Sequence, residues 1–392
     1  MEAYLFLNFK ILLAPKNHAI HRNNVKDCSS LENLKLQSDT MEEVEDTDAQ
    51  ALSFLASEGF LPLILAGHKG MPEAYSNLFH SSRQFFDLPE DSFHKTTFQA
   101  ASGSAASEEG YSDLPGEKSI LTVKSISRCP ELLKQQVETA WNMTGALLLD
   151  ITRQIASTLG LQLNVFDPFV EPCSVLPREK RTPTLLRMFR YIRPQEGEAT
   201  INAERHKDIG LLSLVIGHSP GLEVLDTATG LWKAIESEEF VPEGAKIRSG
   251  GLTATLLVGE TMSLLTRGRY KAGVHRVLCA PDREHAYRFS IVYTLRPAVA
   301  PLYTKDFESE IVGHFAPEEE MDGQSSKELF ERIRSSHWNV NVVKDLREEQ
   351  QKRLRAKAIA TGTHDLDGYV ERYAPPPGPP PGRDCSDIIS TG

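Results

Sequence analysis

Short apolar segments separated by turn residues fill the middle of the chain, from Thr184 to about residue 295. This pattern is typical of an all-β barrel or sandwich, because each short segment suits one strand of a sheet. Thr227-Ala228-Thr229-Gly230 would form a hairpin turn between two of them. We therefore expect a mainly β fold, with strands near residues 185–191, 211–216, 222–226, 231–235, 253–258, 273–279 and 287–295.

Helical patterns lie on either side of this β-rich region. The longest begins at Pro130 and runs to about Leu159, with apolar residues at helical spacing and a glycine placed to end it. Phe60–Leu65 is expected to be a buried strand, and Pro62 favours an edge position because proline cannot donate a hydrogen bond. Residues 99–118, rich in serine, glycine and alanine, are expected to form a loop. The other expected helices cover about residues 47–58, 72–86, 326–333 and 342–360.

These patterns divide the chain into a β core, helical regions that flank it, and polar or Pro-rich ends. The expected regions are 1–46 (poorly ordered or peripheral), 47–180 (helical or mixed, packing on the core), 181–310 (β core), 311–373 (C-terminal helical segment) and 374–392 (Pro-rich tail).

The composition argues against several classes of protein. The 392 residues include 43 Lys+Arg and 54 Asp+Glu, a formal net charge of −11, whereas a nucleic-acid-binding protein needs a net basic face. Five cysteines without a Cys-x-x-Cys spacing indicate reduced thiols rather than disulfides or a zinc site. No run reaches the ~18–20 apolar residues of a membrane span. The first 15 residues lack the basic front of a signal peptide. We expect a cytoplasmic protein that binds neither nucleic acid nor membranes.

Two histidines and one aspartate form a candidate metal site in the β-rich region. His206 and Asp208 are two residues apart, so on one strand both would project to the same face. We expect His206 to start a strand, with the apolar run that follows supplying stiff backbone. His275 lies in another β segment, 275 − 208 = 67 residues later. Two imidazoles and one carboxylate can occupy one face of an octahedral Fe(II) ion and leave three positions open.

Arg288 and Ser290 alternate along an expected strand and therefore face the same way. A guanidinium buried inside a barrel requires an anion, and the arginine fork fits a carboxylate in bidentate geometry while a serine hydroxyl donates a further bond. The alternative is that Arg288 pairs with an acidic residue of the core, which would leave Ser290 unexplained.

With these residues in view, the chain from about 50 to 305 resembles the 2-oxoglutarate/Fe(II)-dependent oxygenases of the isopenicillin N synthase-like family. Several motifs carry the resemblance, in both the β core and the region before it. They are His206–Leu214, Gly259-Glu260-Thr261-Met262, Thr266–Val277, Arg288-Phe289-Ser290, Gly59-Phe60, Phe85–Pro89 and Glu109-Gly110-Tyr111.

The resemblance implies a double-stranded β-helix, or jelly roll, that holds iron through His206, Asp208 and His275. It also implies that Arg288 and Ser290 bind the distal carboxylate of the cosubstrate 2-oxoglutarate. The reaction would use O₂ to oxidise a small organic molecule by hydroxylation, desaturation or ring rearrangement, typically in secondary metabolism. Tyr191 lies where many members place a tyrosine on the cosubstrate, although the usual asparagine two residues earlier is phenylalanine here.

Three other interpretations remain open at this stage. Gly217-His218-Ser219-Pro220-Gly221 matches the Gly-x-Ser-x-Gly elbow of serine hydrolases, which requires a strand before it and a helix after it. The chain could also be an iron oxidase without 2-oxoglutarate, in which Arg288 and Ser290 hold the substrate's own carboxylate, or a non-catalytic binding protein. Tyr111, Lys118 and Arg190 are possible pocket residues. The sequence does not identify the substrate or the oligomeric state.

Overall fold

The structure is a computed structural model that describes residues 48–100, 108–226, 229–237 and 250–361. The chain divides into two units, Met1–Val343 and Lys344–Gly392. Both sheets belong to the first unit, whereas the described part of the second unit is helix α9 (Lys344–Thr361). The expectations for residues 1–46 and for the Pro-rich tail lie outside the described residues.

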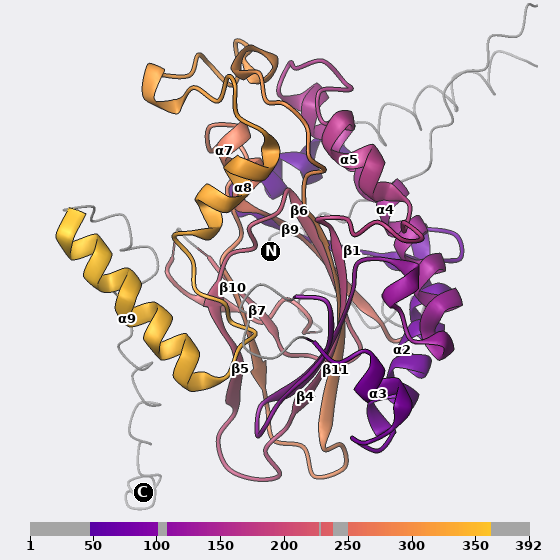
Figure 1. Ribbon diagram of the computed structural model, residues 1–392. Helices are drawn as coiled ribbons and strands as arrows, with labels where there is room; N and C mark the ends of the chain where they lie inside the picture. Colours follow the sequence, from indigo (N-terminus) through magenta and orange to yellow (C-terminus); the bar gives the residue numbers. More distant parts are fainter. Residues whose placement is uncertain (1–47, 101–107, 227–228, 238–249, 362–392) are drawn as a thin grey trace, which may run out of the picture. The chain divides into compact units, whose positions relative to one another are not determined.

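A seven-stranded antiparallel sheet forms the larger layer of the first unit (Figure 1). Its strand order is β1-β9-β6-β11-β4-β3-β2, so β1 lies at an edge, as Pro62 predicts. Strands β6 and β9 are buried along their whole length because sheet and helices cover both faces. The strands are β1 (Phe60–Leu63), β2 (Gly110–Leu114), β3 (Lys118–Val123), β4 (Leu185–Ile192), β6 (Leu212–Gly217), β9 (Thr253–Val258) and β11 (Tyr287–Leu295).

A four-stranded antiparallel sheet faces the larger one, in the order β5-β10-β7-β8. Its strands are β5 (Thr200–His206), β7 (Leu222–Leu225), β8 (Trp232–Lys233) and β10 (His275–Cys279). Side chains from both sheets form a small apolar cluster between them, with Ala203, Leu222 and Val277 from one sheet and Val215 and Leu257 from the other. The two layers are the jelly roll that the sequence predicts.

Helices cover the outer face of the larger sheet (Figure 1). The longest, α4 (Lys134–Thr158), buries apolar residues spaced three and four apart, and Gly160 follows it with a positive φ of 66°. Its Trp141 packs edge-to-face on Tyr293 of β11 and donates a hydrogen bond to the carbonyl of Cys173. The other helices are 48–58, α2 (Met71–Asp87), α3 (Phe93–Thr97), α5 (Asp167–Ser174), α7 (Glu260–Leu265) and α8 (Ser326–Arg334).

Two expectations about strands are wrong. His206 ends strand β5 instead of starting a strand, and residues 110–114 form strand β2, which pairs with β3, within the segment 99–118 expected to be a loop. The β5 segment, Thr-Ile-Asn-Ala-Glu-Arg-His, hides its strand character because its first residues and several later ones face solvent. Side-chain composition alone gives little strand signal at such an edge position.

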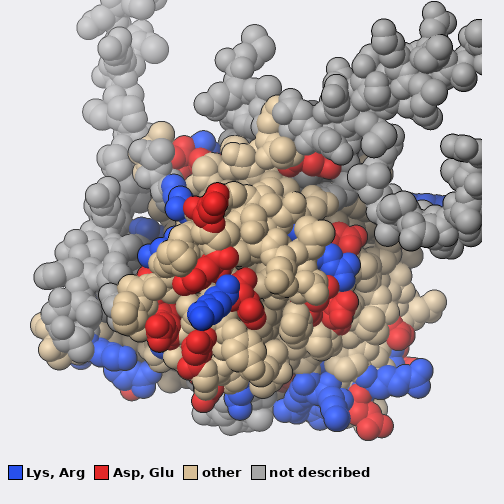
Figure 2. Space-filling view, turned by 90° about the horizontal axis from the view of Figure 1, so that it is seen from above, with Lys and Arg blue, Asp and Glu red and all other residues tan. Residues whose placement is uncertain are grey.

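None of the helices in the described ranges is both long and apolar enough to cross a membrane. On the face seen in Figure 2, acidic and basic side chains are interspersed among uncharged ones.

Candidate metal centre

His206, Asp208 and His275, together called the triad, converge at one end of the smaller sheet. Strands β5 and β10 pair so that His206 lies opposite His275, and Asp208 follows two residues after the end of β5. The rings of the two histidines have centroids 4.2 Å apart, and one ligand atom from each triad residue lies within 4.8 Å of the others. The stiff backbone therefore comes from the pairing of β5 with β10, not from the strand that follows Asp208.

Hydrogen bonds to the backbone set the tautomer of both histidines. Nδ1 of His206 lies 2.7 Å from the carbonyl oxygen of Glu204, and Nδ1 of His275 lies 3.2 Å from that of Gly273. A carbonyl can only accept, so each Nδ1 carries the proton and each Nε2 keeps its lone pair. This is the arrangement in which neutral histidines bind metals.

The third triad residue has an oxygen that is not used by the protein. Oδ2 of Asp208 is buried and accepts no hydrogen bond from the described residues. Burial by itself would raise the pKa of Asp208, but the two neighbouring imidazoles outweigh burial and lower it. Burial, helped by His275, lowers the pKa of His206 to about 3. His206 is therefore a neutral imidazole and Asp208 a carboxylate at neutral pH, and together with His275 they are the donor set of a facial Fe(II) site.

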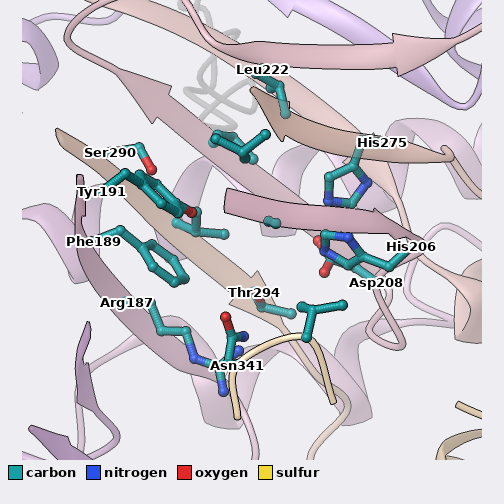
Figure 3. A pocket seen from close by; sticks show the side chains of 15 residues that line it. Arg187, Phe189, Tyr191, His206, Asp208, Leu222, His275, Ser290, Thr294 and Asn341 are labelled. Atoms are coloured by element: carbon teal, nitrogen blue, oxygen red, sulfur yellow. The ribbon is translucent and has the colours of Figure 1, made fainter. Parts of the chain in front are cut away.

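The triad opens into a cavity of about 50 Å³ between the two sheets. Figure 3 shows Tyr191 and Ser290 at one side of it, with Arg187 and Asn341 close together at another. Phe189 stacks its ring on that of Tyr191 with centroids 5.2 Å apart. The rest of the lining is mostly apolar: Ala203, Val215, Leu222, Val277, Val292, Thr294 and Val340.

Arg288 is fully buried, but it does not line the cavity and already has a carboxylate partner. Its Nη2 donates to both oxygens of Glu236, at 2.9 and 3.2 Å, and its Nε donates to the carbonyls of Ser219 and Pro220. Arg288 therefore pairs with an acidic residue of the core, which is the alternative considered from the sequence. This pairing leaves two groups over, because Nη1 of Arg288 and Oγ of Ser290 are buried without a hydrogen-bond partner in the described part of the chain.

The Gly217–Gly221 turn encloses this ion pair. A Cβ on Gly217 would collide with Oε1 of Glu236, and a Cβ on Gly221 would collide with Nε of Arg288. The turn leads from β6 into β7, so the strand is followed by a strand and not by the helix that a hydrolase elbow requires. The hydroxyl of Ser219 accepts a hydrogen bond from Arg193 at 2.7 Å. The Gly-x-Ser-x-Gly match is therefore a structural turn.

A cluster of charges lies behind Arg187. Glu108 pairs with Arg296, lies 3.4 Å from Arg187 and 4.0 Å from Lys124. Burial alone would raise the pKa of Glu108, but the cations, Arg296 foremost, hold it well below its usual range. Burial lowers the pKa of Lys124 to about 8, against the effect of Glu108. Three cations thus share one carboxylate, and Arg187 is the cation that lines the cavity.

A C-terminal segment completes the wall of the cavity through Val340 and Asn341. Buried Lys118 fixes it, donating one hydrogen bond to the carbonyl of Val340 and one to that of Asn202, each at 2.9 Å. His337 adds a contact of 2.8 Å to Glu260. Asn341, Arg187 and Glu236 were not among the expected site residues, and no motif in the sequence marks them.

The three expected pocket residues lie elsewhere. Tyr111 packs on Phe85 and donates to Glu90, while Arg190 lies over the ring of Tyr287 on the outer side of the sheet. Lys118 contacts lining residues from behind, through the carbonyl of Val340 and over the ring of Tyr191, with Nζ 6.0 Å from the ring centroid. None of the three is among the described residues that line the cavity.

Comparison with known proteins agrees with this geometry. Residues 183–297 match the family model of the 2OG-Fe(II) oxygenase superfamily. The chain is 26% identical over 195 residues to oxidoreductase vrtI of Penicillium aethiopicum, covering 50% of this chain and 42% of that protein. It is 28% identical to clavatol oxidase claD of Penicillium crustosum, covering 42% and 43%. It thus spans less than half the length of these curated relatives. The 2-oxoglutarate-dependent dioxygenase gloE of Glarea lozoyensis aligns more fully, at 22% identity over 83% of this chain and 97% of that protein.

Solved structures share the fold. A full-length Neurospora crassa protein in complex with alpha-KG superposes with a TM-score of 0.55 at 22% identity, covering 78% of this chain and 92% of that one. A putative 2OG-Fe(II) oxygenase family protein of Caulobacter crescentus gives 0.54 at 21% identity, covering 72% and 92%. Residues 183–297 thus match the 2OG-Fe(II) oxygenase superfamily, and the jelly roll and the converging triad agree with that match.

Proposed function

We propose that this chain is a non-haem Fe(II), 2-oxoglutarate-dependent dioxygenase that oxidises a small organic molecule. The convergence of the triad carries the proposal, because two lone pairs and one unpartnered carboxylate oxygen meet within 4.8 Å. Buried polar atoms are almost always satisfied, so an unused carboxylate oxygen beside two prepared imidazoles fits a cation.

Iron bound at the triad would supply the activation of O₂, at positions that the protein leaves open. The chain's own residues have the tasks of binding and orientation. The carbonyls of Glu204 and Gly273 hold the proton of each imidazole on Nδ1 and fix the orientation of each ring. The apolar lining between the sheets excludes water from the reacting atoms.

The 2-oxoglutarate end of the site would be the side where Tyr191 and Ser290 lie. Nη1 of Arg288 and Oγ of Ser290 are donors with no described partner, and both come from β11. A carboxylate is the group that best satisfies two such donors together. Tyr191, whose ring lies under the Arg288 guanidinium with Cζ 5.6 Å from its centroid, would form the floor of this subsite.

The substrate end would be the side of Arg187 and Asn341. Arg187 is a cation that lines the cavity, which favours a substrate that carries an acidic or strongly electron-rich oxygen. The names of relatives, among them a clavatol oxidase and a flavanone 3-dioxygenase, support a small molecule of secondary metabolism. A cytoplasmic location is supported by Cys129, Cys173 and Cys279, which are buried free thiols.

Anaerobic titration of the Fe(II)-loaded protein with 2-oxoglutarate tests the proposal. We expect a weak visible charge-transfer band in the parent protein and a weaker band at equal cosubstrate concentration in Arg288→Ala. Bound iron without a band would point to the oxidase that needs no 2-oxoglutarate. Failure to bind iron would contradict the metal site itself.

A further inference from the structure

We propose that Glu236 is a positioning residue that weakens the binding of the 2-oxoglutarate distal carboxylate to Arg288 and limits it to one guanidinium nitrogen. This inference rests on the proposed function. Arg288 has an edge formed by Nε and Nη2 and a remaining nitrogen, Nη1. Glu236 and the carbonyls of the Gly217–Gly221 turn occupy this edge, so Nη1 is the one nitrogen of Arg288 that has no partner among the described residues and could donate to a ligand.

Several hydrogen bonds fix the position of the Glu236 side chain. Besides Arg288, its carboxylate accepts from the backbone N–H of Leu222 at 2.8 Å and from the hydroxyl of Thr253 at 3.3 Å. Its side chain is 2% exposed, and Gly217 leaves the space that the carboxylate fills. A ligand that displaced Glu236 would strand a buried charge and a buried N–H, which is a large cost.

The geometry therefore makes Arg288 a one-nitrogen anchor. A fork–fork pair with the incoming carboxylate would need two parallel N–H donors, and one of the two guanidinium ends is already bonded to Glu236. Ser290 supplies the second donor in place of Nη2. The negative charge of Glu236 also lies on the far side of the same guanidinium, so it repels the cosubstrate carboxylate through a medium of low dielectric constant.

A comparison of two ligands in two variants tests this inference. 2-Oxovalerate has the keto acid end of 2-oxoglutarate but lacks the distal carboxylate, so Glu236 should affect the two ligands differently. Binding of each would be measured by anaerobic calorimetry on Fe(II)-loaded parent and Glu236→Gln, which keeps the shape of the side chain and removes its charge. Glu223→Gln is the matched control, because Glu223 forms a separate ion pair with Arg276 at 2.6 Å on the same sheet.

We expect Glu236→Gln to bind 2-oxoglutarate about tenfold more tightly or better, with the affinity for 2-oxovalerate changed less than about twofold. The preference for 2-oxoglutarate over 2-oxovalerate should therefore rise about tenfold, and it should stay unchanged in Glu223→Gln. The increase in Tm on saturation with 2-oxoglutarate should also be larger in Glu236→Gln than in the parent. In this variant the ligand carboxylate supplies the counter-charge that Arg288 has lost.

An unchanged preference in Glu236→Gln would overturn the inference, since Glu236 would then be a structural partner only. A lower preference would also overturn it, because it would mean that Glu236 improves the anchor. Equal losses for both ligands would show general damage to the site and would count against the inference too. Failure of the parent to bind 2-oxoglutarate at all would contradict the proposed function instead, so the two failures are distinguishable.

Discussion

Asp208 keeps one buried carboxylate oxygen without a partner in the described residues, whereas the buried guanidinium of Arg288 is held by Glu236 and two backbone carbonyls. Both residues carry a charge that the proposed ligands would meet. At the metal end, the carboxylate of Asp208 remains available to a cation. At the other end, Glu236 already neutralises the guanidinium of Arg288. The two ends therefore depend on their ligands to different degrees.

Because of this difference, substitutions of Asp208 and Arg288 should affect ligand binding and the free energy of unfolding in different proportions. An unpartnered charge costs free energy in the folded protein, so its removal should cost binding but little stability. A buried ion pair behaves in the opposite way, because removal of one member strands the other. Variants at the two ends should therefore show different combinations of metal affinity and free energy of unfolding.

The largest expected effect is on the affinity for metal. Asp208→Ala should weaken Fe(II) binding by at least about a thousandfold, or about 4 kcal/mol, because one of three ligands and the only negative charge of the triad are lost. The free energy of unfolding of the metal-free protein should fall only slightly, because the folded protein lowers the pKa of Asp208 and so gains a little stability from its charge. Anaerobic metal titration and urea unfolding measure the two quantities. A clear loss of stability without metal would break the comparison, since it would mean that Asp208 has a structural partner.

The next effect concerns the stability of the metal-free protein. Arg288→Met should lower the free energy of unfolding by about 3–5 kcal/mol, because Glu236 is left buried without its counter-charge. The double variant Arg288→Met, Glu236→Gln should recover most of that loss. Metal affinity should change little in either protein. If the single variant were as stable as the parent, the ion pair would not be the structural element described here.

A third position, Lys124, lies in the cluster of charges around Glu108. The folded pKa of Lys124, about 8, is below its ordinary value of 10.5, so the unfolded chain binds more protons between these pH values. Stability from this group should therefore rise with pH from about 8 to about 10.5 and be constant below that window.

Lys124→Met should abolish this rise and be more stable than the parent at pH 7 by about 2–3 kcal/mol. The difference between the two proteins should disappear above about pH 10.5. Urea unfolding at pH 7, 9 and 11 would measure it. A difference that stays constant across the three pH values would show that Lys124 is not the titrating group.

The smallest effect is expected at Ser219. The turn contacts Arg288 through backbone carbonyls, so Ser219→Ala should remove only the hydrogen bond from Arg193, at about 1 kcal/mol or less. Binding of 2-oxoglutarate should match the parent within about twofold. A fluorophosphonate probe should not label the parent protein, and stoichiometric labelling at Ser219 would restore the hydrolase interpretation.

The sequence predicts most strands and the triad, because both depend on local patterns. Short, largely apolar runs mark β4, β6, β9 and β11, and the triad residues lie in short motifs. Strand β5 is missed because its side chains are polar at an exposed edge. Glu236 and Asn341 are missed for another reason. Each reaches the site from an irregular segment through the tertiary fold, and no spacing rule connects Glu236 to Arg288 or Asn341 to the triad.

The bond between Lys118 and Val340 joins residues 222 positions apart. The strands of both sheets end at Leu295, so Val340 and Asn341 are the last residues of the cavity wall to be synthesised. A chain made only as far as Leu295 would contain the triad and both sheets but not this part of the wall.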